Sequence, residues 1–168
     1  AESLDLPTEW FDEKIDHHIT NFSAIHYPGQ RELAVRPGQL RAGAHSDYGS
    51  LTIVQTDTDV GGLEVQNDDG TWDLVPWVAD AFVVNLGDLM AEWTNDRWVS
   101  TMHRVVNPPP DKVHLSKTSM LFFHQPNYDA VVECIPTCVS TSNPAKYGKT
   151  TSGEHVTMKV TKHRTVAD

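Results

Sequence analysis

The chain has 168 residues, of which 39% are hydrophobic, and it carries a formal net charge of −10. This length fits one domain with a substantial core, and the acidic balance argues against nucleic acid as a partner, because neutralising phosphates requires a basic surface. No apolar run is long enough to cross a bilayer, and the first residues lack the basic and apolar regions of a signal peptide. We therefore expect a cytoplasmic protein that binds neither nucleic acid nor a membrane.

The first half of the chain predicts one helix and four strands. Apolar residues recur at helical spacing over residues 7–19, which predicts the helix. The predicted strands cover residues 21–27, 51–56, 63–66 and 72–75. The last two strands flank Asn67-Asp68-Asp69-Gly70, a sequence typical of a hairpin turn.

The second half continues with short extended segments. Residues 81–86 form an apolar run typical of a buried strand, and a helical turn is predicted over residues 89–93. Further strands are predicted over residues 101–106 and 116–124, separated by the loop Pro108-Pro109-Pro110. Many short strands with little helix indicate a mainly β fold, either a sandwich or a jelly roll.

The pair His45 and Asp47, with His103 far downstream, is the strongest chemical signal in the sequence. Alternate side chains of an extended segment share a face, so His45 and Asp47 can reach one ion while Ser46 points away. Two imidazoles and one carboxylate, with no thiolate, suit iron(II) with open coordination positions better than a closed structural zinc site. The sequence therefore predicts a metal site formed by His45, Asp47 and His103.

The same alternation sorts the later candidates by face. Next to His103, Arg104 points the other way and is expected in a salt bridge or in solvent. Over residues 116–124, one face holds Lys117, Ser119, Leu121 and Phe123, and the other holds His124. If Lys117 faces the metal cavity, His124 does not, and a hydrogen-bonded structural histidine is the better interpretation of it.

The remaining polar candidates favour structural roles. Cys134 and Cys138 have a spacing that suits neither a zinc knuckle nor a disulfide framework, so free thiols are expected. His114 and His155 lie in polar segments and are expected at the surface.

Seven motifs follow one another as an ordered string along the chain. The string runs from about residue 22 to residue 136. Its motifs are Ile25-His26-Tyr27-Pro28, Ala44-His45-Ser46-Asp47-Tyr48-Gly49, Gly61-Gly62-Leu63-Glu64-Val65, Val84-Asn85-Leu86-Gly87-Asp88, Trp93-Thr94-Asn95-Asp96-Arg97-Trp98, Ser100-Thr101-Met102-His103-Arg104-Val105 and Phe122-Phe123-His124-Gln125-Pro126. This string resembles the C-terminal catalytic domain of the isopenicillin N synthase-like family of iron(II) and 2-oxoglutarate-dependent oxygenases. The separation of Asp47 and His103 is also similar to that of the family's ligands.

The resemblance implies a double-stranded β-helix, which is a distorted, cupin-like jelly roll, with a few short helices. It implies that His45, Asp47 and His103 hold Fe(II) and act in catalysis, and that 2-oxoglutarate and molecular oxygen are co-substrates. The implied activity is a dioxygenase that hydroxylates or desaturates a small molecule. Tyr27 and Ser119 match residues that bind the distal carboxylate of 2-oxoglutarate in the family.

The chain departs from the family pattern at Lys117, which occupies the position of an arginine that binds the same carboxylate. Lysine can still pair with a carboxylate, but it lacks the bidentate fork of a guanidinium. Two alternatives therefore stay open. One is an iron oxidase that works without 2-oxoglutarate, as isopenicillin N synthase does, and the other is a cupin-like metal-binding or small-molecule-binding module.

A second departure is length, because family members carry an N-terminal segment that is mostly absent from this sequence. We expect residues 1–168 to form one domain, the catalytic barrel without that segment, and to expose apolar surface.

Arg41 alternates with Gly43 and His45, so it could reach a carboxylate of the substrate. The alternative is an ordinary cation at the surface or at a sheet edge.

Overall fold

The computed structural model describes residues 1–29 and 38–165, and most of its regular structure is β. The strands are β1 (Asn21–Tyr27), β2 (Ala42–His45), β3 (Leu51–Thr56), β4 (Leu63–Gln66), β5 (Trp72–Leu74), β6 (Val83–Leu86), β7 (His103–Val105), β8 (Lys117–His124), β9 (Val131–Val132) and β10 (Thr150–Thr151). The helices are η1 (Glu2–Leu4), α1 (Asp12–Ile15), α2 (Asp88–Trp93), η2 (Pro136–Cys138) and α3 (Ser152–Thr165).

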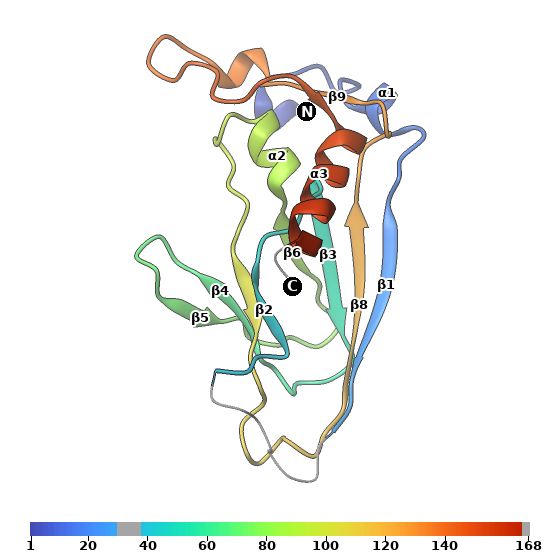
Figure 1. Cartoon of the computed structure of the whole chain (residues 1–168), viewed down its shortest axis with the longest axis vertical. Coiled ribbons are helices and arrows are strands. Elements are labelled where there is room, and N and C mark those ends of the chain that lie inside the picture. Colours follow the sequence, from blue (N-terminus) through green and yellow to red (C-terminus); the bar gives the residue numbers. More distant parts are fainter. Residues whose placement is uncertain (30–37, 166–168) are drawn as a thin grey trace.

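The longer strands form two antiparallel four-stranded sheets (Figure 1). The first sheet has the order β1-β8-β3-β6 and the second has the order β2-β7-β4-β5, while β9 and β10 pair separately. The chain crosses repeatedly from one sheet to the other, so residues distant in sequence meet between the sheets. This mainly β architecture agrees with the sequence prediction, and the predicted hairpin is present as β4 and β5.

The space between the sheets holds a cavity of about 150 Å³. Alternate residues of β8 line it, namely Lys117, Ser119, Leu121 and Phe123, while the intervening residues face the outside of the sheet. On that outer face Phe22, Val84 and Met120 are exposed, which agrees with the expectation of exposed apolar surface.

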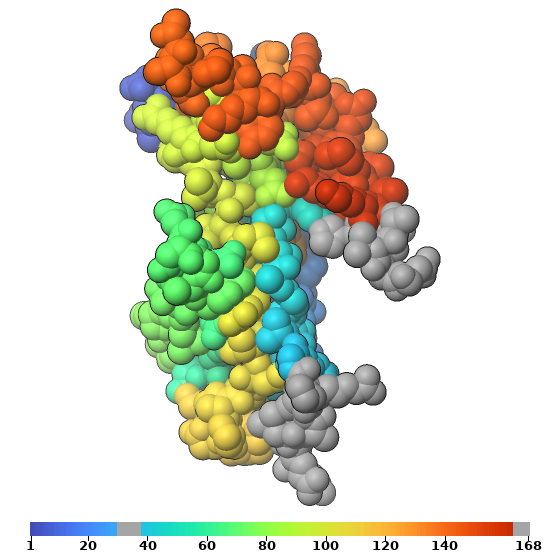
Figure 2. Space-filling model, turned by 60° about the vertical axis from the view of Figure 1, so that its left-hand side comes forward, coloured from blue at the N-terminus to red at the C-terminus, as the bar shows by residue number. Residues whose placement is uncertain are grey.

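The main buried core lies at a different end of the molecule from this cavity. Its buried members are Leu4, Leu89, Trp93, Val132, Ile135 and Cys138. Trp10 and Phe11 pack edge-to-face against Trp93, with ring centroids 6.2 and 5.4 Å away. In the space-filling view, the yellow-green residues of α2 and the orange-to-red C-terminal residues gather at one end, above the strands of the second sheet (Figure 2).

The predicted helix over residues 7–19 is much shorter in the structure, because α1 covers only Asp12–Ile15. Asn127 ends it: its backbone N–H donates to the carbonyl of Lys14, and its side-chain oxygen accepts the N–H of His17. These contacts with a distant loop take groups that a longer helix would use internally.

The sequence analysis did not anticipate α3, whose residues are mostly polar. A capping box marks its start: Glu154 N–H donates to the Thr151 hydroxyl, and Thr151 N–H donates to the Glu154 carboxylate. That Thr-x-x-Glu pattern was the available signal. None of the helices in residues 1–29 and 38–165 is long and apolar enough to cross a membrane.

Candidate metal and co-substrate site

The three predicted metal ligands meet at the edge of the second sheet. His45 ends β2 and is the direct cross-strand partner of His103, which begins β7, and their ring centroids are 4.3 Å apart. Asp47 follows two residues after β2, and its Oδ1 lies 3.7 Å from His103 Nε2. One donor atom from each residue lies within 4.8 Å of the other two. The adjacent strands thus bring together three side chains from two distant segments.

Backbone carbonyls fix the orientation of both imidazoles. His45 Nδ1 lies 2.7 Å from the Gly43 carbonyl, and His103 Nδ1 lies 3.0 Å from the Thr101 carbonyl. A carbonyl only accepts, so each Nδ1 carries the proton and each Nε2 keeps a lone pair. This is the arrangement in which outer hydrogen bonds prepare a histidine to bind a metal.

Asp47 is only 7% exposed and is held from two sides. Asn85 Nδ2 donates to Oδ2 at 2.7 Å, which leaves Oδ1 on the side of His103. The backbone N–H of Asp88 donates to the Asp47 carbonyl at 2.8 Å. The sequence analysis gave Asn85 no role, although a lone amide inside the apolar run 81–86 was a usable signal.

The donor set fits Fe(II). It combines two imidazole nitrogens and one carboxylate oxygen, with no thiolate, and all three residues line the cavity between the sheets. His45, Asp47 and His103 all line that cavity, together with Tyr27, Lys117 and Ser119. The structure therefore brings all six residues predicted from the sequence to one cavity.

Lys117 is the charged residue on the cavity wall contributed by β8, and it is only 3% exposed. Its Nζ donates to the Gly61 carbonyl at 2.7 Å and lies 5.2 Å from the centre of the Tyr27 ring. Burial lowers the pKa of Lys117 from 10.5 to about 8, and the charge of Arg41 acts in the same direction, while Asp57 opposes it. Gly61 presents its carbonyl from a backbone with φ of +73°, a conformation that favours glycine.

The hydroxyls of Tyr27 and Ser119 complete this end of the cavity. Tyr27 is the cross-strand partner of Lys117, and Ser119 lies two residues along the same face of β8. Within the described residues neither hydroxyl forms a hydrogen bond. Burial raises the pKa of Tyr27, with the charge of Arg41 opposing it, so the phenol keeps its proton at neutral pH and can donate.

Residues predicted to point away from the cavity do so. His124 Nδ1 lies 2.7 Å from the Ser50 hydroxyl, as expected for a structural histidine. Arg104 Nε donates to Glu64 at 2.6 Å, and its guanidinium lies over the Trp72 ring. Val105 and Leu121 are apolar parts of the cavity wall.

Arg41 does not follow the predicted alternation. The pairing of β2 with β7 shifts between Ala42 and His45, and both of these residues line the cavity although they are three positions apart. This irregularity separates Arg41 from the face of His45. The Arg41 guanidinium lies 5.5 Å from the centre of the Tyr27 ring instead.

The expectation for His155 was wrong. It is 1% exposed, and its Nδ1 lies 3.3 Å from a Glu92 carboxylate oxygen, because α3 packs beside α2. His114 is exposed as expected. Cys134 and Cys138 are both free thiols, also as expected.

Comparison with known proteins identifies a family and several relatives of this chain. A family model described as the 2OG-Fe(II) oxygenase superfamily matches residues 16–126. A homoarginine-6-hydroxylase of Oryza sativa subsp. japonica is 42% identical over 119 residues, which cover 70% of this chain and 35% of that protein. A validamycin A dioxygenase of Streptomyces hygroscopicus subsp. limoneus is 31% identical over 160 residues, which cover 95% of this chain and 43% of that protein.

Among solved structures, the chain is similar to a full-length Neurospora crassa protein in complex with alpha-KG. The TM-score is 0.88 with 33% identity, over 95% of this chain and 49% of that one. The chain therefore spans between about a third and a half of the length of the relatives it matches.

Proposed function

The chain belongs to the 2OG-Fe(II) oxygenase superfamily, and we propose that it is an Fe(II)- and 2-oxoglutarate-dependent dioxygenase that oxidises a small molecule. The observation that carries the proposal is the convergence of His45, Asp47 and His103 on the wall of one cavity. The wall of that cavity also carries a buried cation and two hydroxyl donors, which suit the distal carboxylate of a dicarboxylate co-substrate.

In this proposal His45, Asp47 and His103 hold the iron. When bound, Fe(II) supplies oxygen activation coupled to oxidative decarboxylation of 2-oxoglutarate. Gly43 and Thr101 carbonyls keep the imidazole nitrogens aimed at the ion, and Asn85 keeps the Asp47 carboxylate turned toward it. The apolar wall, which includes Val105 and Leu121, limits the access of water to the reacting atoms.

Lys117, Ser119 and Tyr27 hold the distal carboxylate of 2-oxoglutarate in this proposal. The ammonium of Lys117 supplies charge, and the two hydroxyls supply neutral donors. Their shared face and their unused hydrogen-bonding capacity support this role.

We also infer the finer classification that the motif string suggests. The chain is an isopenicillin N synthase-like member, its two sheets form a double-stranded β-helix, and residues 1–168 form one catalytic domain. The alternation of consecutive strands between two four-stranded sheets supports the barrel assignment.

The test is succinate formation by the purified chain. Fe(II)-loaded protein should convert 2-oxoglutarate to succinate in the presence of oxygen, and a His45→Ala, Asp47→Ala double variant should not. Oxygen uptake that depends on a substrate but not on 2-oxoglutarate would instead indicate the oxidase alternative. Binding of Mn(II) with neither activity would indicate a binding module.

A further inference from the structure

Two cations lie beside the ring of Tyr27, which together with Lys117 lines the cavity. Lys117 Nζ is 5.2 Å from the centre of the Tyr27 ring, and the Arg41 guanidinium carbon is 5.5 Å from the same centre. The two positive charges therefore repel each other, and the charge of Arg41 contributes to the lowered pKa of Lys117. Like charges held together in a partly buried place repel each other unless an anion joins them.

Within residues 1–29 and 38–165, neither cation forms an ion pair with a carboxylate. By contrast, Arg104 pairs with Glu64 and Lys159 pairs with Asp88, at 2.6 and 2.7 Å. Acidic side chains outnumber basic ones by 23 to 13 in this protein. In so acidic a chain, two neighbouring cations that form no ion pair with any described carboxylate indicate a place for an anion from outside.

The hydrogen-bonding capacity of the pair is also largely unused. Lys117 has three N–H groups, and one of them donates to the Gly61 carbonyl. The side chain of Arg41 makes no hydrogen bond to a described residue, although its backbone N–H donates to Val105 at 2.9 Å and fixes its position beside β7. A guanidinium offers the planar pair of donors that matches a carboxylate, which an ammonium lacks.

We propose that Arg41 is a second cationic residue of the co-substrate site, where its guanidinium shares the distal carboxylate of 2-oxoglutarate with the Lys117 ammonium. This inference rests on the proposed function. The irregularity in β2 moves Arg41 off the face of His45 and toward Tyr27. The planar fork that is missing at position 117 would thus come from the residue that precedes β2, beside the ring of Tyr27.

The test compares two ligands that differ only at the distal carboxylate. Mn(II)-loaded protein is titrated calorimetrically under nitrogen with 2-oxoglutarate and with 2-oxovalerate, which has the same five-carbon chain but ends in a methyl group. We expect Arg41→Gln to weaken 2-oxoglutarate binding by about 10- to 100-fold and to leave 2-oxovalerate binding unchanged. Arg41→Lys, which keeps the charge but not the fork, should fall between the wild type and Arg41→Gln.

Arg97→Gln is the matched control, because it removes one arginine charge from an exposed pair with Asp5. It should bind both ligands like the wild type. Mn(II) affinity and the melting temperature of each variant show that the site and fold are intact. If Arg41→Gln does not fold, Arg41→Lys carries the comparison.

Unchanged 2-oxoglutarate affinity in Arg41→Gln would overturn the assignment, and so would an equal loss for both ligands, since that would mark Arg41 as a support of the pocket wall. In either case a wild type that prefers 2-oxoglutarate over 2-oxovalerate leaves the proposed function standing. A wild type that binds Mn(II) but not 2-oxoglutarate would overturn both proposals.

Discussion

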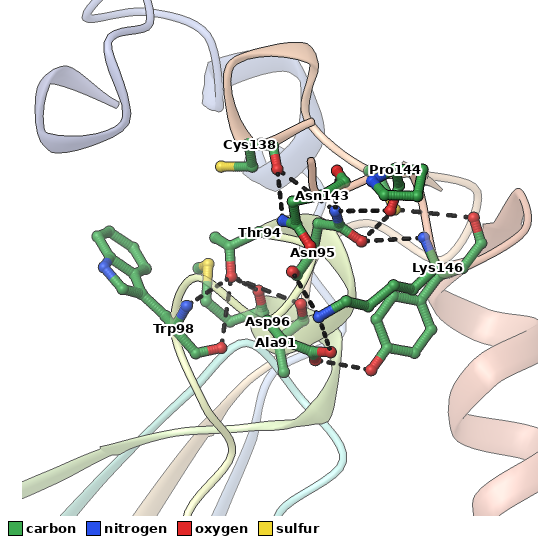
Figure 3. Close-up of polar contacts among 12 residues, drawn as sticks. Ala91, Thr94, Asn95, Asp96, Trp98, Cys138, Asn143, Pro144 and Lys146 are labelled. Atoms are coloured by element: carbon green, nitrogen blue, oxygen red, sulfur yellow. Dashed lines mark hydrogen bonds and ion pairs between the residues drawn. The ribbon is translucent and has the colours of Figure 1, made fainter. Parts of the chain in front are cut away.

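Two polar regions of this protein differ in how fully their side chains are hydrogen-bonded within the chain. We call the first the Asn95 cluster: Thr94, Asn95 and Asp96 with the loop 138–147 (Figure 3). Asn95 is 1% exposed, and its Nδ2 lies within hydrogen-bond distance of three carbonyls, those of Cys138, Asn143 and Pro144. Its Oδ1 accepts the backbone N–H of Lys146 at 2.9 Å. The amide finds its partners inside the chain.

The second region is the cavity between the sheets, where the buried polar groups keep unused capacity. Each histidine of the triad keeps a nitrogen lone pair, Lys117 keeps two N–H groups, and the hydroxyls of Tyr27 and Ser119 have no partner within the described residues. These groups face the cavity, where polar side chains with spare hydrogen-bonding capacity can bind a ligand. The comparison teaches that polar groups hydrogen-bonded to one another stabilise the fold, whereas polar groups with spare capacity remain available to bind ligands.

Removing a ligand of the metal should produce the largest effect on the cavity side. We expect His45→Ala to abolish succinate formation and to weaken Mn(II) by more than the 10- to 100-fold typical of outer-shell changes, with little change in melting temperature. Manganese titration followed by electron paramagnetic resonance measures this. His26→Ala, at an exposed histidine of β1, is the control. Normal Mn(II) binding by His45→Ala would remove His45 from the site.

The Asn95 cluster should respond in the opposite sense. Asn95→Ala removes the amide and its hydrogen bonds, and alanine tolerates the φ of +50° less well than asparagine does. We therefore expect a loss of about 2–4 kcal/mol in the free energy of unfolding. Urea denaturation measures it, while Mn(II) affinity of the folded fraction should stay unchanged. Asn95→Gly also loses the amide contacts, but glycine accepts a positive φ, so its free energy of unfolding should fall by less than that of Asn95→Ala. A stability loss below 0.5 kcal/mol, taken as roughly the effect of an ordinary surface change, would contradict the comparison.

Lys117→Met should improve stability and impair function together. Because the folded-state pKa of Lys117 is about 8, against 10.5 for the free side chain, the unfolded chain binds this proton more tightly. The charge therefore opposes folding below pH 8, and that penalty fades as pH rises from about 8 toward 10.5. At pH 7 we expect Lys117→Met to gain about 1–2 kcal/mol, after the lost bond to Gly61 is included.

The same variant should bind 2-oxoglutarate about 10- to 150-fold more weakly than the wild type. Anaerobic calorimetry with the Mn(II)-loaded proteins measures the affinity. Equal affinities would show that Lys117 is not part of the co-substrate site. A loss of stability would mean that Lys117 belongs with the internally satisfied groups.

Asn85→Ala should weaken the metal site moderately, because Asn85 only orients the Asp47 carboxylate. We expect Mn(II) affinity to fall about 10-fold, at the lower end of outer-shell effects. Asn85→Asp tests the direction of the hydrogen bond, since a second carboxylate next to Asp47 cannot donate and should do at least as much harm. Wild-type affinity in both variants would show that the packing of Gly87 and Asp88 is enough to hold Asp47.

The pH dependence of 2-oxoglutarate binding should be the smallest effect. The ligand needs the charged ammonium, which the free protein loses as pH rises past about 8, so the dissociation constant should rise about tenfold between pH 7 and pH 9. Lys117→Arg keeps its charge throughout this range and should show a flat profile. A slope that is identical in both proteins would assign the titration to another group.

Local sequence patterns by themselves determined much of this protein. The alternation of residues along β8 separated Lys117 and Ser119 from His124, and the family resemblance indicated which of the two faces lines the cavity. The hairpin of β4 and β5 followed from its turn sequence. Extended segments have a fixed period of two, which predicted that His45 and Asp47 share a face, and the family resemblance supported His103 as the third residue of the triad. Side-chain type then indicated the chemistry.

The tertiary structure decided whatever depended on contacts between distant segments. Asn127 shortened the first helix, the packing of α3 beside α2 buried His155, and the irregularity between β2 and β7 turned Arg41 toward Tyr27. The orientation of Asn85 likewise depends on Asp47, which lies on another segment. Local propensities are weak beside such contacts, because a single hydrogen bond or ion pair in a buried place can outweigh the preferences of several residues.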